Sequence, residues 1–187
     1  MAKILVTGGA GYIGSHTCIQ LLSAGHEVVV LDNLSNSSVE SLARVQALAA
    51  KKLDFVEGDI LDQQILDQIF QHHSIDAVIH FAGLKAVGES QKEPLKYFEN
   101  NISGSISLVK AMERAQVFKL VFSSSATVYD EANISPLNET MPTGMPSNNY
   151  GYTKLIVEQL LEKLSAADER WSIALLRYFN PVGAHQS

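Results

Sequence analysis

The sequence predicts an α/β fold in which a doubly wound parallel sheet is flanked by helices. Short β-branched runs alternate with longer segments whose apolar residues recur every three or four positions, as in repeated strand–helix–strand units. Most of these runs are almost continuously apolar, which is typical of strands covered by helices on both faces. The chain has 187 residues, of which 46% are hydrophobic and 18% charged. This length and composition favour one domain with a packed core that needs no disulfide.

Six strands and five helices are expected to alternate along the chain. The strands are predicted at residues 4–7, 27–31, 54–56, 77–80, 120–123 and 173–177. The helices are predicted at residues 13–24, 39–50, 63–72, 94–115 and 149–167. No linker or repeat interrupts this order, so residues 1–187 are interpreted as a single domain.

Two segments are expected to be irregular. Residues 130–148 are rich in Pro, Asn and Thr, and so long a connection in a compact domain is usually a lid or a binding loop. The tail after Phe179 shows no further element. We expect it to lead toward a part that this sequence does not contain.

The charge balance and the single cysteine restrict the class of partner and the compartment. Twenty acidic residues outnumber 14 basic ones, and no block of Lys and Arg stands out, so nucleic acid is not an expected partner. No apolar stretch approaches the ~18 residues of a membrane span, and no signal peptide is evident. Cys18, the only cysteine, cannot form an internal disulfide and is expected to be a small core residue. A cytoplasmic location follows as a prediction.

A glycine-rich turn follows the first predicted strand. Gly8, Gly9, Gly11 and Gly14 satisfy the pattern G-x-G-x-x-G at the point where the strand gives way to a helix. Such glycines permit a tight bend and let the backbone and the helix N-terminus approach a pyrophosphate. The turn therefore predicts the dinucleotide-binding loop of a Rossmann fold, although a tight turn in another α/β protein is the alternative.

Two carboxylates follow the next two strands. Asp32 ends the second strand, 18 residues after Gly14, where a dinucleotide fold places an acid against the adenosine ribose. A carboxylate there repels a 2′-phosphate, which favours NAD over NADP. Asp59 follows the third strand, and either an adenine contact or a helix N-cap would account for it.

Tyr150, Lys154 and Ser125 are the candidate catalytic residues. Tyr150 and Lys154 are four residues apart on the last predicted helix, so they share one face. A neighbouring ammonium is expected to lower the tyrosine pKa from about 10 and to make the phenol a usable base for an alcohol. Ser125, at the end of the fifth strand, is expected to bind the reacting hydroxyl or to relay its proton. The alternative is that Ser123, Ser124 and Ser125 only complete the strand.

The histidines are not expected to be functional. His80 closes a buried strand, so a hydrogen-bonded core imidazole is the favoured interpretation. His72 and His73 are typical of an exposed helix end. None shows metal-ligand spacing with Asp, Glu or Cys, so no metal is expected.

Longer motifs accompany the glycine loop and the Tyr–Lys pair. They are LDNL at 31–34, EGDI at 57–60, HFAGLKAVGES at 80–90, SSSATVY at 123–129 and LRYFNPVGAH at 176–185. Together they resemble the extended short-chain dehydrogenase/reductases and, within these, the UDP-glucose 4-epimerases. The resemblance covers essentially the whole chain, and the motif at 80–90 is its most specific part.

The resemblance implies three overlapping sets of site residues. NAD would be surrounded by Gly8, Gly11, Tyr12, Ile13, Gly14, Asp32, Asn33, Asn36, Asp59, Ile60, Phe81, Ala82, Gly83, Lys85, Asn100, Tyr150, Lys154 and Tyr178. The catalytic residues would be Ser125, Tyr150 and Lys154. The UDP-sugar substrate would be bordered by Lys85, Ser125, Tyr150, Phe179 and Asn180.

The resemblance also implies a reaction. Tyr150 would take the proton of the sugar 4-hydroxyl while C4 gives a hydride to NAD, and the hydride would return to the other face of the 4-keto ring. Related dehydratases carry an Asp-Glu pair where this chain has Ala126 and Thr127, so elimination is rejected. Two alternatives stay open: an epimerase for UDP-N-acetyl sugars, and a non-catalytic NAD-binding fragment that lacks the C-terminal substrate lobe.

The family pattern further suggests a homodimer and shows two departures in this chain. The dimer would form through the helices predicted at 94–115 and 149–167. Asp130 stands where the family usually has Gly, which raises the question of a positive φ. Asn149 stands where Pro commonly precedes the tyrosine, and it is expected to serve as a helix N-cap.

Overall fold

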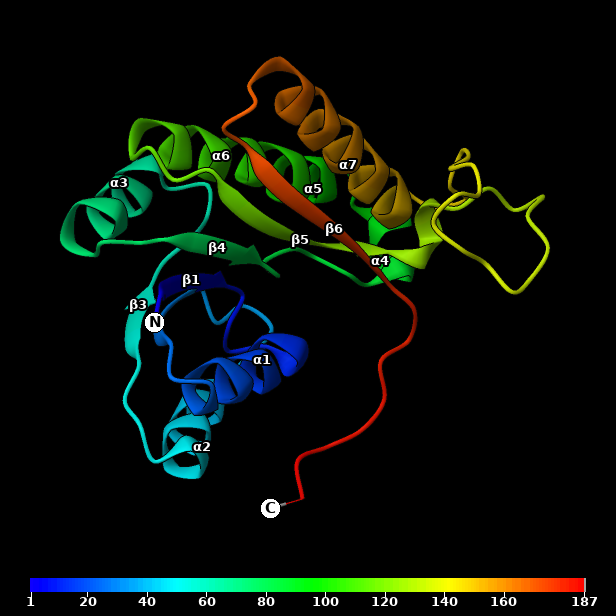
Figure 1. Cartoon of the computed structure of the whole chain (residues 1–187). Coiled ribbons are helices and arrows are strands. Elements are labelled where there is room, and N and C mark those ends of the chain that lie inside the picture. Colours follow the sequence, from blue (N-terminus) through cyan, green and yellow to red (C-terminus); the bar gives the residue numbers. More distant parts are fainter. Residues whose placement is uncertain (187) are drawn as a thin grey trace.

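A computed structural model describes residues 1–186, and a six-stranded parallel sheet forms its centre (Figure 1). The strands are β1 (Lys3–Thr7), β2 (Glu27–Asp32), β3 (Asp54–Glu57), β4 (Ala77–His80), β5 (Lys119–Ser125) and β6 (Ser172–Tyr178). Their order, β3-β2-β1-β4-β5-β6, is that of a dinucleotide-binding Rossmann sheet, and every pair is parallel. The predicted doubly wound sheet is therefore confirmed, with strand ends that differ by at most two residues.

Helices cover both faces of this sheet. The helices are α1 (Tyr12–Ser23), α2 (Val39–Ala49), α3 (Gln63–His72), α4 (Val87–Lys92), α5 (Pro94–Phe98), α6 (Gly104–Arg114) and α7 (Asn149–Ala167). In Figure 1, α1 and α2 lie below the sheet, whereas α3, α5, α6 and α7 lie above it. Within the described residues 1–186, no helix combines the length and the apolar character that crossing a bilayer would require.

The alternation of side chains along β1 and β2 separates two cores. Leu5, Val29 and Leu31 pack into a cluster with residues of α3, α6 and α7, whereas Val6 and Val30 pack with residues of α1 and α2. Successive residues of a strand point to opposite faces, and all five of these side chains are fully buried. The apolar runs in the sequence are thus explained by burial on both faces.

The predicted helix at 94–115 is wrong in one respect, because it is broken into three parts. Between α5 and α6, residues Glu99–Ser103 form a π-helical turn. This turn directs the Asn101 side chain at the loop after β4, where it accepts a hydrogen bond from Leu84 N (2.8 Å) and donates one to Leu84 O (3.0 Å). Helical periodicity in the sequence cannot predict these contacts, because the partner Leu84 lies outside the helix. Such π-helical turns often occur at functional sites.

Helix α4 and the cap of α7 also differ from the predictions. The six residues of α4 contain Gly88 and show too short a pattern to be recognised. The N-cap of α7 is Asn148, whose side chain accepts from Gly151 N at 2.8 Å. Asn149 is the first helical residue, and its side chain donates to Ser90 O (2.9 Å). The prediction that Asn149 caps the helix is therefore wrong by one position.

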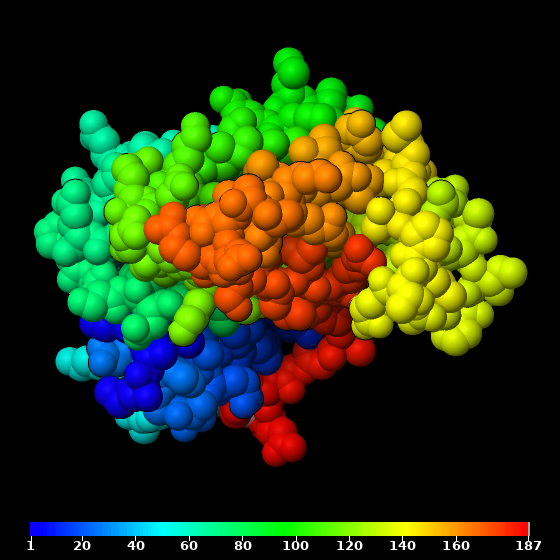
Figure 2. Space-filling model, turned by 45° about the horizontal axis from the view of Figure 1, so that its top comes forward, coloured from blue at the N-terminus to red at the C-terminus, as the bar shows by residue number. Residues whose placement is uncertain are grey.

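The long loop at 130–148 projects from one end of the molecule (Figure 2). Of the described residues outside glycine, Leu34, Ala50 and Gln116 have a positive φ, so Asp130 needs no left-handed backbone. Its Oδ1 accepts a hydrogen bond from Ala132 N (2.8 Å) instead.

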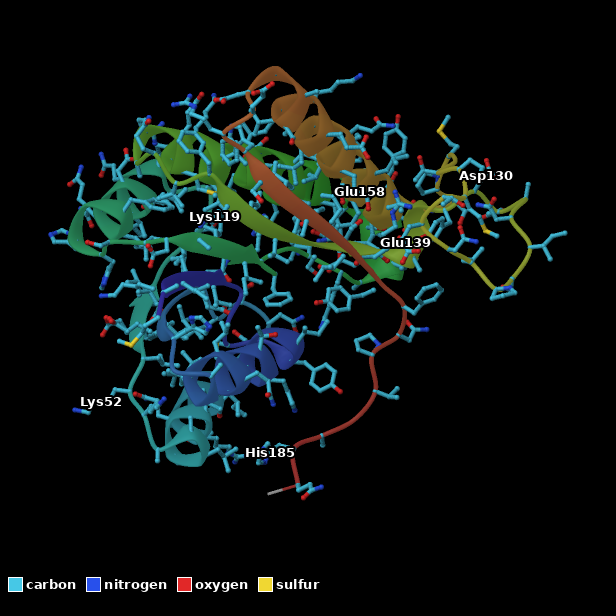
Figure 3. The ribbon with its side chains drawn as sticks, viewed as in Figure 1. Lys52, Lys119, Asp130, Glu139, Glu158 and His185 are labelled. Carbon is cyan, nitrogen blue, oxygen red and sulfur yellow. The ribbon has the colours of Figure 1, made fainter. Side chains whose placement is uncertain are left out.

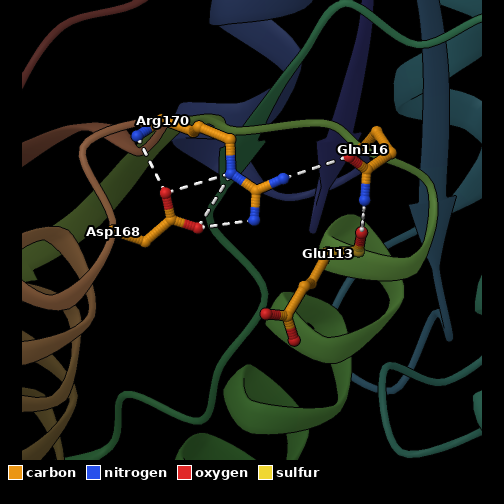
Figure 4. Close-up of polar contacts among 4 residues, drawn as sticks. All are labelled: Glu113, Gln116, Asp168 and Arg170. Carbon is orange, nitrogen blue, oxygen red and sulfur yellow. Dashed lines mark hydrogen bonds and ion pairs between the residues drawn. The ribbon is translucent and has the colours of Figure 1, made fainter.

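At the opposite end of the strands, Arg170 joins the turns that precede β5 and β6 (Figure 4). Its guanidinium donates to both carboxylate oxygens of Asp168 and to Oε1 of Gln116, at 2.7–3.2 Å. It also stacks on the ring of Phe118, 4.3 Å from the centroid. Side-chain contacts therefore stabilise the amino ends of β5 and β6. They leave the carboxyl ends of the strands, at the other edge of the sheet, uncovered.

Candidate active site

A cleft of about 470 Å³ opens at the carboxyl ends of β1 and β4. These two strands lie where the strand order reverses, which is where open α/β sheets bind ligands. The cleft is lined by all of the predicted site residues except Asp59: Gly8, Gly11, Tyr12, Ile13, Gly14, Asp32, Asn33, Asn36, Ile60, Phe81, Ala82, Gly83, Lys85, Asn100, Ser125, Tyr150, Lys154, Tyr178, Phe179 and Asn180. Residues more than 170 positions apart in the chain thus meet at one site.

The glycine loop forms one wall of the cleft. Gly8 has φ +71°, and a Cβ there would lie 2.6 Å from the backbone nitrogen of Ala82. A Cβ on Gly14 would run into the carbonyl of Gly8 and come within 2.8 Å of Gly9 Cα. Helix α1 begins after Gly11, which has no side chain to cap it, so its first amides are available to an anion.

Asp32 and Asp59 occupy different positions. Asp32 is 8% exposed and lines the cleft, and its carboxylate accepts hydrogen bonds from Ala10 N (3.0 Å) and Ser37 Oγ (2.8 Å). Asp59 lies beside the cleft and accepts from Asn33 Nδ2 at 2.7 Å. The N-cap of α3 is Asp62, so the N-cap interpretation of Asp59 is wrong.

Tyr150 and Ser125 face each other across the cleft floor. A hydrogen bond from the Ser125 side chain favours the phenolate, but burial of the phenol is the larger effect and raises the pKa of Tyr150. Ser125 Oγ also accepts from the amide (3.3 Å) and the hydroxyl (3.0 Å) of Thr127. The serine is therefore held by the 3₁₀ turn Ala126–Val128 that follows it.

Lys154 lies one helical turn from Tyr150, as predicted, but its ammonium is directed elsewhere. Its Nζ donates to Ser123 O (2.8 Å) and lies 4.8 Å from the centroid of the Phe122 ring. The expected lowering of the Tyr150 pKa by Lys154 is therefore not found in this structure. Burial lowers the pKa of Lys154 itself to about 8, and the charge of Glu158 partly opposes this.

A buried ion pair stands behind Lys154. Glu158, which is labelled in Figure 3, lies one turn further along α7 and is 1% exposed. Its carboxylate accepts hydrogen bonds from Arg177 Nε (3.1 Å) and Nη2 (2.9 Å). Arg177 comes from β6 and stacks on Tyr129, 4.8 Å from the ring centroid. The pair of Glu158 and Arg177 was not predicted from the sequence, although the spacing of four residues from Lys154 to Glu158 places these two side chains on one helix face.

Comparison with known proteins identifies the family. Residues 4–187 match the NAD dependent epimerase/dehydratase family. The chain belongs to this family. The UDP-glucose 4-epimerase of Bacillus subtilis (strain 168) is 60% identical over 184 residues, which are 98% of this chain and 54% of that protein. The chain spans about half the length of the curated relatives it matches.

Solved structures agree with this assignment. The UDP-glucose-4-epimerase from Stenotrophomonas maltophila, crystallised with bound NAD and formylated UDP-arabinopyranose, has a TM-score of 0.96 at 53% identity, covering 99% of this chain and 55% of that one. The UDP-glucose 4-epimerase from Bifidobacterium longum, in complex with NAD+ and UDP, has a TM-score of 0.97 at 48% identity, covering 98% and 55%. The family fold therefore extends through the whole described chain.

Two residues outside the candidate catalytic residues, His80 and Cys18, are core residues, as predicted from the sequence. His80 is 2% exposed, and its ring nitrogens hydrogen-bond with Thr7 Oγ1 (2.6 Å) and Ser105 Oγ (2.9 Å). Burial lowers its pKa to about 3, so it is a neutral core imidazole. Cys18 is fully buried, and burial raises its pKa to about 12, so it is an inert core residue.

The loop at 130–148 lies outside the cleft lining. Within residues 1–186, no residue of this loop lines the cleft. The segment that does reach over the cleft is the one after β6, where Phe179, Asn180 and Pro181 line it. Tyr12, also in the lining, donates a hydrogen bond to Gly183 O at 2.5 Å. The loop at 130–148 therefore stays a predicted lid or binding loop that does not contribute to this cleft.

Proposed function

We propose that this chain supplies the NAD-binding and catalytic part of a UDP-glucose 4-epimerase, which interconverts UDP-glucose and UDP-galactose. One observation carries the proposal: Ser125, Tyr150 and Lys154 line the same cleft as the glycine loop and Asp32. The 60% identity to a UDP-glucose 4-epimerase supports it. Ala126 and Thr127 follow Ser125, so the carboxylate pair that elimination would need is replaced by uncharged residues.

The cleft fits NAD in shape and in chemistry. The loop at Gly8 and Gly14 leaves no room for side chains, so a pyrophosphate can approach its backbone and the first amides of α1. The carboxylate of Asp32 is oriented by Ala10 and is suited to two ribose hydroxyls. When bound, NAD supplies a carbon that accepts a hydride and returns it.

The chain's own residues would handle the proton. Tyr150 would take the proton of a sugar hydroxyl at its phenol oxygen, and Ser125, which lines the same cleft, would hydrogen-bond that hydroxyl. Because burial raises the Tyr150 pKa, the phenolate requires a nearby cation when the proton is accepted. Lys154, with a pKa of about 8, is mostly charged at neutral pH and is the nearest candidate on the same helix face.

The substrate site and the assembly are proposed from the same cleft and helices. Lys85, Phe179 and Asn180 line the cleft and would border the sugar nucleotide. We propose one domain over residues 1–187, with further substrate contacts made by the part of the relatives that this chain does not match.

A homodimer through α5, α6 and α7 is supported by Leu95 of α5, which is 84% exposed. The buried free thiol of Cys18 supports a cytoplasmic location.

Titration calorimetry with NAD and NADP tests the cofactor proposal. We expect NAD to bind and NADP to bind at least about tenfold more weakly, because Asp32 repels a 2′-phosphate. The variant Asp32→Asn should reduce this preference, whereas Tyr150→Phe should retain NAD. Failure of the unaltered chain to bind NAD would refute the proposal.

Turnover is tested with a panel of UDP-galactose and UDP-N-acetylgalactosamine. The panel is applied to this chain and to the chain extended by the C-terminal part of the Bacillus subtilis relative. We expect activity on UDP-galactose in the extended protein, and its loss in the Tyr150→Phe variant of that protein. Unchanged turnover in this variant would remove Tyr150 as the base. A preference for the N-acetylated sugar would favour the alternative epimerase only if it is seen with this protein's own C-terminal part.

A further inference from the structure

The N-terminus of α7 is held from two sides. The side chain of Asn148 accepts the amide of Gly151 (2.8 Å), which is the usual local cap. The amide of Tyr150 lies in the first turn and has no partner within the helix. It donates instead to Oγ of Ser90 (3.2 Å), which comes from α4, 60 positions earlier in the chain.

The hydrogen bonds of Ser90 determine the role of its hydroxyl. Ser90 is fully buried, and its Oγ donates its one proton to Val87 O at 2.6 Å. The oxygen can therefore act only as an acceptor toward Tyr150. The carbonyl of Ser90 accepts a second bond from this helix, from Asn149 Nδ2 (2.9 Å). Two consecutive residues of α7 are thus held by one residue of α4.

Helix α4 is itself anchored independently of α7. Its N-cap residue Ala86 donates through its backbone amide to the hydroxyl of Tyr97 (3.0 Å), a fully buried side chain of α5. The same hydroxyl contacts the carboxylate of Glu89 at 2.8 Å. Lys85 and Val87, at the start of this segment, line the cleft. Ser90 therefore belongs to a hydrogen-bonded segment whose first residues form part of the cleft wall.

We propose that Ser90 is a positioning residue that, through the backbone amide of Tyr150, fixes the catalytic phenol relative to the cleft wall. The inference rests on the proposed function, since that function makes Tyr150 the base. A phenol attached to a helix end moves with that end, and a misplacement of about 1 Å can cost on the order of a hundredfold in rate. The buried hydroxyl of Ser90 prevents such movement.

The test compares the unaltered 187-residue chain with variants that each carry one substitution. Ser90→Ala removes the acceptor, whereas Ser90→Thr and Ser90→Val differ from each other by the hydroxyl alone. Ser38→Ala is the matched control, because Ser38 caps α2 by accepting from Glu40 N (3.3 Å), away from α7. NMR of ¹³C-labelled tyrosine rings follows the Tyr150 signal and its titration, with Tyr150→Phe to assign it. Hydrogen exchange follows the Tyr150 amide, and calorimetry follows ADP-ribose binding.

We expect Ser90→Ala to speed exchange of the Tyr150 amide by about tenfold or more, since a buried donor loses its partner. The Tyr150 ring signal should shift, and its titration should move down toward pH 10 as the phenol becomes more exposed. Affinity for ADP-ribose should change by less than about twofold, because the glycine loop is distant and independent. Ser90→Thr should resemble the unaltered chain more than Ser90→Val does.

An unchanged Tyr150 ring signal and titration in Ser90→Ala would overturn the inference, and so would an equal change in Ser38→Ala. If the bulkier variants fail to fold, Ser90→Ala and Ser38→Ala decide it alone. Failure of the unaltered chain to bind ADP-ribose would count against the proposed function and not against the contact between Ser90 and Tyr150.

Discussion

The two walls of the cleft differ in the groups that form them, because one is mainly backbone and the other mainly side chains. The wall formed by β1, α1 and β2 is mainly backbone: the glycine loop, in which Gly8 has φ +71°, and a helix N-terminus, with the carboxylate of Asp32 beside them. The wall formed by β5, α7 and β6 consists of side chains: Ser125, Tyr150 and Lys154 line it, and the buried ion pair of Glu158 and Arg177 lies behind Lys154. A backbone site depends on space, whereas a side-chain site depends on charge balance. The two halves should therefore fail for different reasons.

The largest effect is expected from removing the charge of Glu158, behind the wall formed by β5, α7 and β6. Glu158→Gln leaves the guanidinium of Arg177 without its carboxylate in a largely buried position, which should lower the free energy of unfolding by about 3–5 kcal/mol. It should also lower the pKa of Lys154 further below about 8, because Glu158 is the group that raises it. Urea denaturation and ¹³Cε NMR of Lys154 measure the two effects.

The control for this prediction is an exposed pair of the same kind. Glu40 and Arg44 are 63% and 75% exposed, so Glu40→Gln should change the free energy of unfolding by less than about 0.5 kcal/mol. Equal losses in the two variants would show that burial of the Glu158 pair does not matter.

The next effect tests the space at the first wall. Gly8→Ala places a Cβ 2.6 Å from a backbone nitrogen in a left-handed conformation, and we expect it to cost about 2–4 kcal/mol and to abolish NAD binding. Gly25 also has a positive φ (+90°), but a Cβ there would meet no described atom within 4 Å. Gly25→Ala should therefore cost only about 1 kcal/mol and leave NAD binding intact. Similar NAD affinities in both variants would contradict this reading of the loop.

The last effect is absent at neutral pH and develops only on acidification; it concerns His80, whose ring joins β1 to α6. Its pKa is about 3 in the folded chain against 6.5 when exposed, so between these values only the unfolded state binds the proton. Stability should therefore fall as the pH is lowered through this window, by up to about 1.4 kcal/mol per pH unit. His80→Gln keeps a donor and an acceptor but does not titrate.

Urea denaturation at several pH values between 7 and 4 measures this contribution. The carboxylates titrate in both proteins, so the difference between the two curves reports His80 alone. Parallel curves for the unaltered chain and His80→Gln would contradict the assignment of a neutral buried imidazole.

The predictions from sequence succeeded where a contact is local or periodic. The strands follow from their apolar runs, and Gly8, Gly14 and Asp32 follow from a turn and a strand end that lie close together in the chain. They failed where the partner is distant. The broken helix at Glu99–Ser103 depends on Leu84, and the cap at Tyr150 depends on Ser90. Neither contact can be predicted from the hydrophobic periodicity of the two helical segments, because each partner lies far away in the sequence.

The sequence by itself determined the fold class, the glycine loop and the spacing of Tyr150 and Lys154, because backbone conformation and helix periodicity are local properties. Only the tertiary structure decided where the Lys154 ammonium points, which carboxylate faces it and what holds the Tyr150 amide. Those outcomes depend on burial, on the hydrogen bonds to Ser123 and Ser90 and on the charge of Glu158, and burial exists only once the sheet and its helices have assembled.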